Sequence, residues 1–170
     1  MLGTYNAINQ RNNVNLILVS PVDGEVIPLS KVDDPYFSTG KMGRGIAVIP
    51  SNGKIYAPAD SIVAAVFKTG HAVILKTYSG IDLLIHIGID TVRLNGEGFK
   101  IYCQKGDNVQ TGDLLVEVDL DLLNEKGYCS TIPIIVCNAD NYGSITMKNS
   151  GYVKALTEIL DLRACEPQEI

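Results

Sequence analysis

The residues with the clearest chemical potential are His71 and His86, because the chain of 170 residues contains only these two histidines. Both lie beside one predicted β-hairpin, in which a strand follows His71, residues 78–80 form the turn and the return strand reaches His86. An unperturbed imidazole has a pKa of about 6.5, so near pH 7 it is largely neutral and offers a free nitrogen lone pair. A pair of such rings can bind a metal ion or attack an electrophile.

The hairpin is expected to place the two imidazoles on one face of the sheet, both open to solvent. If Tyr78 and Ser79 form a two-residue loop, His71 pairs directly with His86, and if Ser79 and Gly80 form it, the histidines are diagonal neighbours. Directly opposed Cβ atoms lie about 4.5–5.5 Å apart and diagonal ones about 7–8 Å apart. Either register brings both rings within reach of one small group, whereas a three-residue loop would break the parity.

Three interpretations of the pair follow from its chemistry. Each histidine can be an unrelated surface or core residue. Two imidazoles also suit zinc, but an intrinsic site needs a third ligand, and the sequence has no HxH or HExxH motif. In the third interpretation one imidazole accepts a phosphoryl group while the other donates a hydrogen bond to the phosphoryl oxygens. That division supplies the positioning and charge stabilisation that phosphoryl transfer needs.

The elements that must position these histidines are short strands, because 16 glycines and 7 prolines interrupt runs rich in Val, Ile, Leu and Tyr. This spacing predicts an all-β fold, an antiparallel β-sandwich or barrel-like sandwich hybrid with one or two short helices. Strands are expected at 15–19, 25–28, 45–50, 54–57, 61–69, 71–77, 81–87, 99–103, 114–119, 132–138, 144–148 and 157–162.

The clearest predicted helix spans 119–126, with Asp119 or Asp121 as its N-cap and Gly127 ending it. In the strand 81–87, alternation places Ile81, Leu83, Ile85 and Ile87 on a core face and Asp82, Leu84 and His86 on the other face. The predicted domain covers 14–162, between a flexible N-terminal tail at 1–13 and a C-terminal tail at 163–170.

Composition and charge exclude several classes of protein. Hydrophobic residues make up 46% of the chain and charged residues 19%, which is typical of a globular protein. No apolar run approaches the roughly 18 residues of a membrane span, so membrane insertion is not expected. The net charge is −5 and the cations are scattered, which argues against nucleic acid as a partner and favours a basic protein. The four cysteines have no CxxC spacing and no secretory signal precedes them, so a cytoplasmic location is expected.

One region of the sequence resembles a known family. The strings HIGIDTV at 86–92 and LNGEGF at 94–99 closely resemble the active-site region of the glucose-type IIA proteins (EIIA-Glc family) of the bacterial phosphoenolpyruvate–sugar phosphotransferase system. The resemblance covers about residues 15–162. Shorter matches are PVDGE at 21–25, GIA at 45–47, APAD at 57–60, TGHA at 69–72, VDL at 118–120, LL at 122–123 and the region 131–133.

The resemblance implies an antiparallel β-sandwich of barrel-like form and a role for each of four residues. His86 matches the histidine that carries the phosphoryl group on Nε2, and His71 matches a second histidine that hydrogen-bonds the phosphate without being phosphorylated. Thr69 matches the residue that orients this second histidine. Gly88 matches the position whose carbonyl holds the other ring nitrogen of the acceptor, and such a bond at Nδ1 leaves Nε2 free to attack.

The same resemblance implies two partner proteins. The donor is the phosphohistidine of the small carrier HPr and the acceptor is a cysteine of a IIB domain, so the chain is expected to be a phosphotransferase component in sugar uptake. The family docks its partners on a shallow apolar depression rimmed by carboxylates, which suits a basic and transient partner. The matching positions are Phe37, Met42, Phe67, Leu84 and Val92, with Asp34 and Asp90 on the rim. Lys41 and Lys76 depart from the family pattern and are expected to make the rim less negative.

No cofactor is expected to be required, and a zinc ion shared by His71 and His86 would need a further ligand from a partner. One alternative is a zinc-dependent hydrolase on a related β fold, although Gly88 stands where that class needs a ligand. Another is a biotinyl or lipoyl carrier module, for which Met147-Lys148 is the nearest match to a modifiable lysine.

Overall fold

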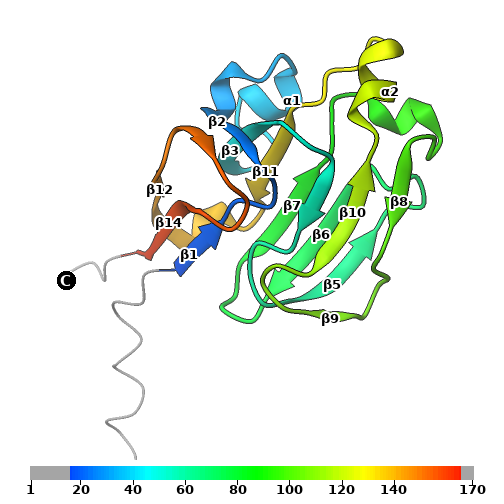
Figure 1. Ribbon diagram of the computed structural model, residues 1–170. Helices are drawn as coiled ribbons and strands as arrows, with labels where there is room; N and C mark the ends of the chain where they lie inside the picture. The colour runs from blue at the N-terminus through cyan, green and yellow to red at the C-terminus, as the bar shows by residue number, and fades with distance from the viewer. Residues whose placement is uncertain (1–15, 166–170) are drawn as a thin grey trace, which may run out of the picture.

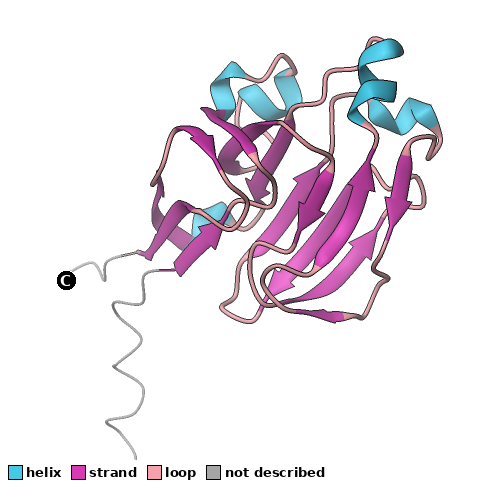
Figure 2. Cartoon of the chain, viewed as in Figure 1, coloured by secondary structure: helices cyan, strands magenta, loops and turns pink. Residues whose placement is uncertain are grey.

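The computed structural model describes residues 16–165, which form three antiparallel sheets with a few short helices (Figure 1, Figure 2). The predicted all-β class is therefore confirmed. Two sheets have three strands each, in the orders β1-β14-β12 and β4-β10-β8, and the third has eight strands in the order β13-β2-β3-β11-β7-β6-β5-β9.

The eight-stranded sheet consists of β13 (Gly151–Val153), β2 (Gly24–Pro28), β3 (Arg44–Pro50), β11 (Ile132–Val136), β7 (Asp82–His86), β6 (Ala72–Thr77), β5 (Ser61–Val66) and β9 (Asn108–Val109). The two smaller sheets consist of β1 (Leu16–Val19), β14 (Glu158–Ala164) and β12 (Tyr142–Met147), and of β4 (Lys54–Tyr56), β10 (Leu114–Val118) and β8 (Phe99–Ile101).

The helices lie mainly toward one end of the large sheet, where α1 and α2 both stand (Figure 1). They are α1 (Pro35–Ser38), α2 (Leu120–Glu125) and the 3₁₀ turns η1 (Leu29–Lys31), η2 (Thr91–Leu94) and η3 (Ala139–Asn141). The predicted cap of α2 is confirmed, because the Asp119 side chain accepts the backbone N–H of Leu122. Among residues 16–165, no helix combines the length and the apolarity that a membrane crossing requires.

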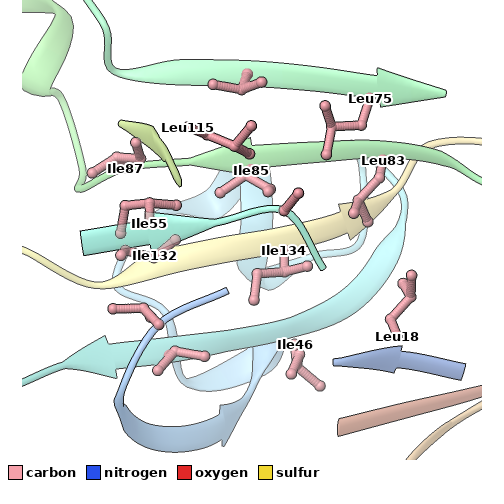
Figure 3. Packing of buried hydrophobic residues seen from close by; sticks show 14 of the residues in the cluster. Leu18, Ile46, Ile55, Leu75, Leu83, Ile85, Ile87, Leu115, Ile132 and Ile134 are labelled. Atoms are coloured by element: carbon pink, nitrogen blue, oxygen red, sulfur yellow. The ribbon is translucent and has the colours of Figure 1, made fainter. Parts of the chain in front are cut away.

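The main core lies between the central strands of the large sheet and the two smaller sheets, and Figure 3 shows side chains from these sheets meeting in it. Leu83 and Ile85 of β7 and Ile134 of β11 point into this core and are fully buried. Their neighbours Leu84 and Ile135 point to the opposite face and join a second, smaller cluster that also contains Phe37. Both faces of β7 and β11 are thus covered, and the alternation predicted for 81–87 is confirmed.

Two details of the expected fold differ from the structure. Strand β14 continues to Ala164, because Arg163 and Ala164 pair with β12 beyond the expected boundary at 162. The edge strands β9 and β13 were not expected, because they span only two and three residues and carry no resolvable period-two pattern. The predicted tail at 1–13 lies outside the described residues, as do residues 166–170.

Candidate active site

The two histidine rings lie next to each other, with their centroids 5.3 Å apart and their planes at 75°. The predicted proximity is confirmed, but the register argument for it was wrong. Ala72 and not His71 pairs with His86, because Tyr78, Ser79 and Gly80 form a three-residue turn between β6 and β7. In a regular ladder this register would put His71 on the face opposite His86.

His71 reaches His86 because it lies outside the β-ladder. It precedes β6 by one residue, at the end of the turn that connects β5 to β6, so the alternation of the strand does not fix the direction of its side chain. Its backbone carbonyl accepts the N–H of Ile87 at 2.6 Å, which joins this turn to the end of β7. The turn is shaped by Gly70, whose φ of +72° is accessible mainly to glycine.

His86 ends β7 with one ring nitrogen held and the other free. Its Nδ1 lies 2.7 Å from the carbonyl oxygen of Gly88. A carbonyl only accepts hydrogen bonds, so Nδ1 carries the proton and Nε2 carries the lone pair in the neutral ring. This is the tautomer that nucleophilic attack from Nε2 requires.

His71 is held in a similar way by a side chain. The Oγ1 atom of Thr69 lies 2.5 Å from Nδ1 of His71, so Nε2 is the nitrogen left for other contacts. Phe67 packs against the same ring with centroids 5.2 Å apart. The two sequence-predicted orienting groups, Thr69 and Gly88, are therefore both in hydrogen-bond contact with the histidines assigned to them.

The two rings differ in their exposure to solvent. His71 is only 7% exposed, whereas His86 is half-buried. The expectation that both rings are open to solvent is thus wrong for His71, whose ring packs between those of Phe67 and His86. A partner can reach the pair mainly through His86.

The surroundings of both rings favour the neutral imidazole. Burial lowers the pKa of His86, although the hydrogen bond to Gly88 and the negative charges of Asp34 and Asp90 act in the opposite direction. Burial also lowers the pKa of His71, and the proximity of His86 lowers it further. At pH 7 Nε2 of His86 is therefore mostly unprotonated, with its lone pair available.

We expect both histidines to titrate with pKa values below 6.5 in the folded protein. Since the unfolded chain binds these protons more readily, the stability that they contribute is present above pH 6.5 and is lost as the pH falls through the lowered folded-state pKa values. The measurement is an NMR titration of the two imidazole C2 protons, assigned by the disappearance of one resonance in His86→Gln. A midpoint above 6.5 for either ring would contradict the expectation.

The positions expected to form the docking surface divide into exposed and buried ones. Met42, Phe67 and Val92 are 43%, 44% and 47% exposed, so they can contact a partner directly. Phe37 and Leu84 are each only 6% exposed. Phe37 supports the site from the protein interior, because its buried ring packs on that of His86 with the centroids 5.0 Å apart.

The two carboxylates of the expected rim also shape the backbone around His86. Asp34 caps α1 by accepting the N–H of Tyr36 at 2.8 Å, and this helix carries Phe37 to the histidine. Asp90 is exposed, adopts a φ of +58° and starts η2. Both side chains are near enough to affect the pKa of His86.

The lysines expected to weaken the rim have different positions. Lys76 pairs with Asp82 at 3.5 Å, at the end of the hairpin away from His86, and four strand residues correspond to about 13 Å. Lys76 therefore does not change the charge around the histidines. Lys41 lies over the ring of Tyr36 in α1, with its Nζ 5.7 Å from the centroid.

The structure also bears on the alternative sites. Within residues 16–165, no three His, Cys, Asp or Glu side chains gather in a way that could hold a metal ion. Lys148, the candidate modifiable lysine, follows β12 and forms an ion pair with Glu158. Neither alternative function gains an observation from these residues.

Sequence reasoning missed two features that build the site. Helix α1 was not predicted, although Asp34-Pro35 is an N-cap followed by a proline at the first helical position. Thr91 was not singled out, although it is fully buried and its hydroxyl donates to the carbonyl of Ile87 at 2.6 Å. Nothing in the sequence distinguishes this threonine from a surface residue of a turn.

Comparison with known proteins gives consistent matches. Residues 16–142 match the family model for the phosphoenolpyruvate-dependent sugar phosphotransferase system, EIIA 1. A glucose-specific EIIA component of Oceanobacillus iheyensis is 44% identical over 134 residues, which are 79% of this chain and 81% of that protein. The glucose permease IIA structure from Mycoplasma capricolum superposes with a TM-score of 0.82 at 34% identity and covers 88% of this chain and 96% of its own.

A longer relative shows the same similarity over a small part of its length. A glucose-specific EIIBCA component of Corynebacterium glutamicum is 41% identical over 149 residues, or 88% of this chain. The chain spans only 22% of that relative. The similarity to EIIA proteins is thus found both in proteins of comparable length and in one region of a larger protein.

Proposed function

Because this chain belongs to the EIIA 1 family of the phosphoenolpyruvate-dependent sugar phosphotransferase system, we propose that Nε2 of His86 carries the phosphoryl group that the family transfers. The observation that supports this choice of atom is the hydrogen bond from Nδ1 of His86 to the Gly88 carbonyl. This bond leaves the lone pair on Nε2.

The transfer has two steps that leave the chain unchanged. In the first, the lone pair of Nε2 attacks the phosphorus of phosphohistidine in HPr, an N–P bond forms on His86, and the donor's N–P bond breaks with its electron pair returning to the donor nitrogen. In the second, a cysteine thiolate of a IIB domain attacks the phosphorus, an S–P bond forms, and the electron pair of the N–P bond returns to Nε2 of His86. Neither step requires a cofactor.

His71 serves this transfer as the group that stabilises the phosphoryl oxygens. Thr69 holds Nδ1 of His71, and the His71 ring lies edge-on to that of His86, with the ring centroids 5.3 Å apart. A group bound to Nε2 of His86 therefore comes within reach of His71. A preorganised hydrogen-bond donor beside a developing charge is an effective source of rate enhancement in phosphoryl transfer. His71 itself is mostly buried and does not compete as the acceptor.

The partners proposed are HPr as donor and a IIB domain as acceptor. The exposed side chains of Met42, Phe67 and Val92, together with the carboxylates of Asp34 and Asp90, would offer such partners apolar contact and negative charge. The Corynebacterium relative carries EIIB and EIIC in its name together with EIIA, which supports a IIB partner. The free thiols of all four cysteines fit the cytoplasmic location that we propose.

The test is phosphorylation of the purified chain by phosphoenolpyruvate, enzyme I and HPr. We expect one phosphoryl group per chain, labile in acid and stable in base, and a proton-coupled ³¹P–¹⁵N measurement should place it on Nε2 of His86. The control omits HPr and should give no label. Label on a hydroxyl, on His71 or on Nδ1 would contradict the proposal.

A further inference from the structure

The Gly88 carbonyl fixes the tautomer of His86, so whatever orients this carbonyl controls the nucleophile. Gly88 is buried and has a φ of +79°. The Gly88 carbonyl lies in the planar peptide unit Gly88–Ile89, which is joined at the Gly88 Cα atom to the preceding planar unit, Ile87–Gly88. The direction of the carbonyl relative to His86 therefore depends on how both units are held. A glycine between two unrestrained planes would leave the carbonyl free to turn away from His86.

The plane after Gly88 is held by a backbone hydrogen bond. The N–H of Ile89 belongs to the same peptide unit as the Gly88 carbonyl, and it donates to the carbonyl of Cys129 at 2.9 Å. In a trans peptide the N–H and C=O point in opposite directions. The bond to Cys129 therefore directs the Gly88 carbonyl away from Cys129 and toward Nδ1 of His86.

The plane before Gly88 is held by Thr91. The carbonyl of Ile87 belongs to that peptide unit and accepts the Thr91 hydroxyl at 2.6 Å. Thr91 is 0% exposed, so water does not compete for this bond. Its methyl group also packs over Gly88, because a Cβ added at Gly88 would lie 2.5 Å from Cγ2 of Thr91.

We propose that Thr91 is a positioning residue, whose buried hydroxyl holds the Ile87–Gly88 peptide and thereby keeps His86 in the tautomer with the proton on Nδ1. Its effect on phosphoryl transfer rests on the proposed function, whereas its effect on the tautomer is a property of the unphosphorylated protein. The inference rests on two hydrogen bonds, from Thr91 to Ile87 and from His86 to Gly88, which are connected by the peptide bond between Ile87 and Gly88.

The test compares Thr91→Val, which removes the hydroxyl and keeps the shape, with Thr91→Ser, which keeps the hydroxyl and removes the methyl group. Ring ¹⁵N shifts of His86 at pH 8 report which nitrogen carries the proton. We expect wild type and Thr91→Ser to show Nδ1–H alone, and Thr91→Val to show a mixture of both tautomers. Phosphorylation by HPr should be roughly tenfold slower in Thr91→Val and close to wild type in Thr91→Ser.

The matched control is Thr77→Val, which removes a buried hydroxyl at the other end of the same hairpin, where Oγ1 of Thr77 accepts the N–H of Ile81 at 2.8 Å. This variant should keep the Nδ1–H tautomer. A folded Thr91→Val protein with the wild-type tautomer would overturn the inference. If Thr91→Val does not fold, Thr91→Ser decides, because mixed tautomers in that variant would show that the hydroxyl is not the positioning group. Absence of phosphorylation in wild type would refute the proposed function and leave the tautomer result valid.

Discussion

Replacing His86 by Gln is expected to abolish phosphorylation, with the rate falling by at least about a thousandfold because no alternative nucleophile occupies its position. The amide nitrogen of Gln has its lone pair delocalised into the carbonyl, so it forms no bond to phosphorus at a useful rate. The neighbouring His71 cannot substitute, since it is 7% exposed and Thr69 fixes its Nδ1. The measurement is incorporation of label from phosphoenolpyruvate through enzyme I and HPr.

The control for this substitution must show that the fold and the neighbouring imidazole survive. His86 is half-buried and lies at the end of β7, so Gln should be accommodated with little change in stability. The remaining histidine resonance should still titrate, and the far-ultraviolet circular dichroism should match wild type. Persistent acid-labile label in a folded His86→Gln protein would place the acceptor elsewhere and remove the assignment of His86.

The large features of the fold could be predicted because their causes are local. Alternation along 81–87 separates Leu83 and Ile85 from Leu84, and the structure puts them in two different apolar clusters. Asp119 predicts the start of α2, because its side chain accepts a hydrogen bond from a backbone N–H only three residues later in the sequence. Such signals involve only residues that are close together in the chain, so they can be recognised without the structure.

The register at the histidines could not be predicted, because it depends on one residue in a turn. Tyr78, Ser79 and Gly80 permit a two-residue or a three-residue connection, and the choice reverses the face of every residue in one strand. The predicted proximity of His71 and His86 nevertheless holds, because the turn before β6 and not the ladder aims His71. The prediction that His71 and His86 are in contact was thus correct, but its cause is the backbone conformation of residues 67–71 and not the register of the strands.

The resemblance to EIIA proteins supplied what spacing alone did not. It matched Thr69 and Gly88 to the two groups that the structure places against the ring nitrogens. It also grouped Phe37 with the docking surface, whereas the structure buries Phe37 against His86. A position in a motif does not distinguish a side chain that contacts a partner from one that supports the site, because burial depends on tertiary packing.

Replacing His71 by Gln is expected to slow the two transfer steps unequally. In the proposed receiving step the nucleophile is the neutral imidazole of His86, and the Gln amide at position 71 could still donate a hydrogen bond to the phosphoryl oxygens. In the proposed onward step the nucleophile is a cysteine thiolate, which brings a further negative charge to the already anionic phosphoryl group. A histidine beside that charge can take up a proton, and Gln cannot, so we expect onward transfer to fall by about 10²–10³ while labelling remains within roughly tenfold of wild type.

One phosphorylated preparation can test this difference with two acceptors. Phosphorylated His71→Gln protein mixed with unphosphorylated HPr transfers the group back to a neutral imidazole, whereas mixing with a IIB domain requires transfer to a thiolate. We expect the first transfer to stay near the wild-type rate and the second to be nearly lost. Equal slowing of both would show that His71 acts by holding the site together through its contacts with Thr69 and Phe67 rather than by balancing charge. An unchanged rate to IIB would exclude His71 from the transfer altogether.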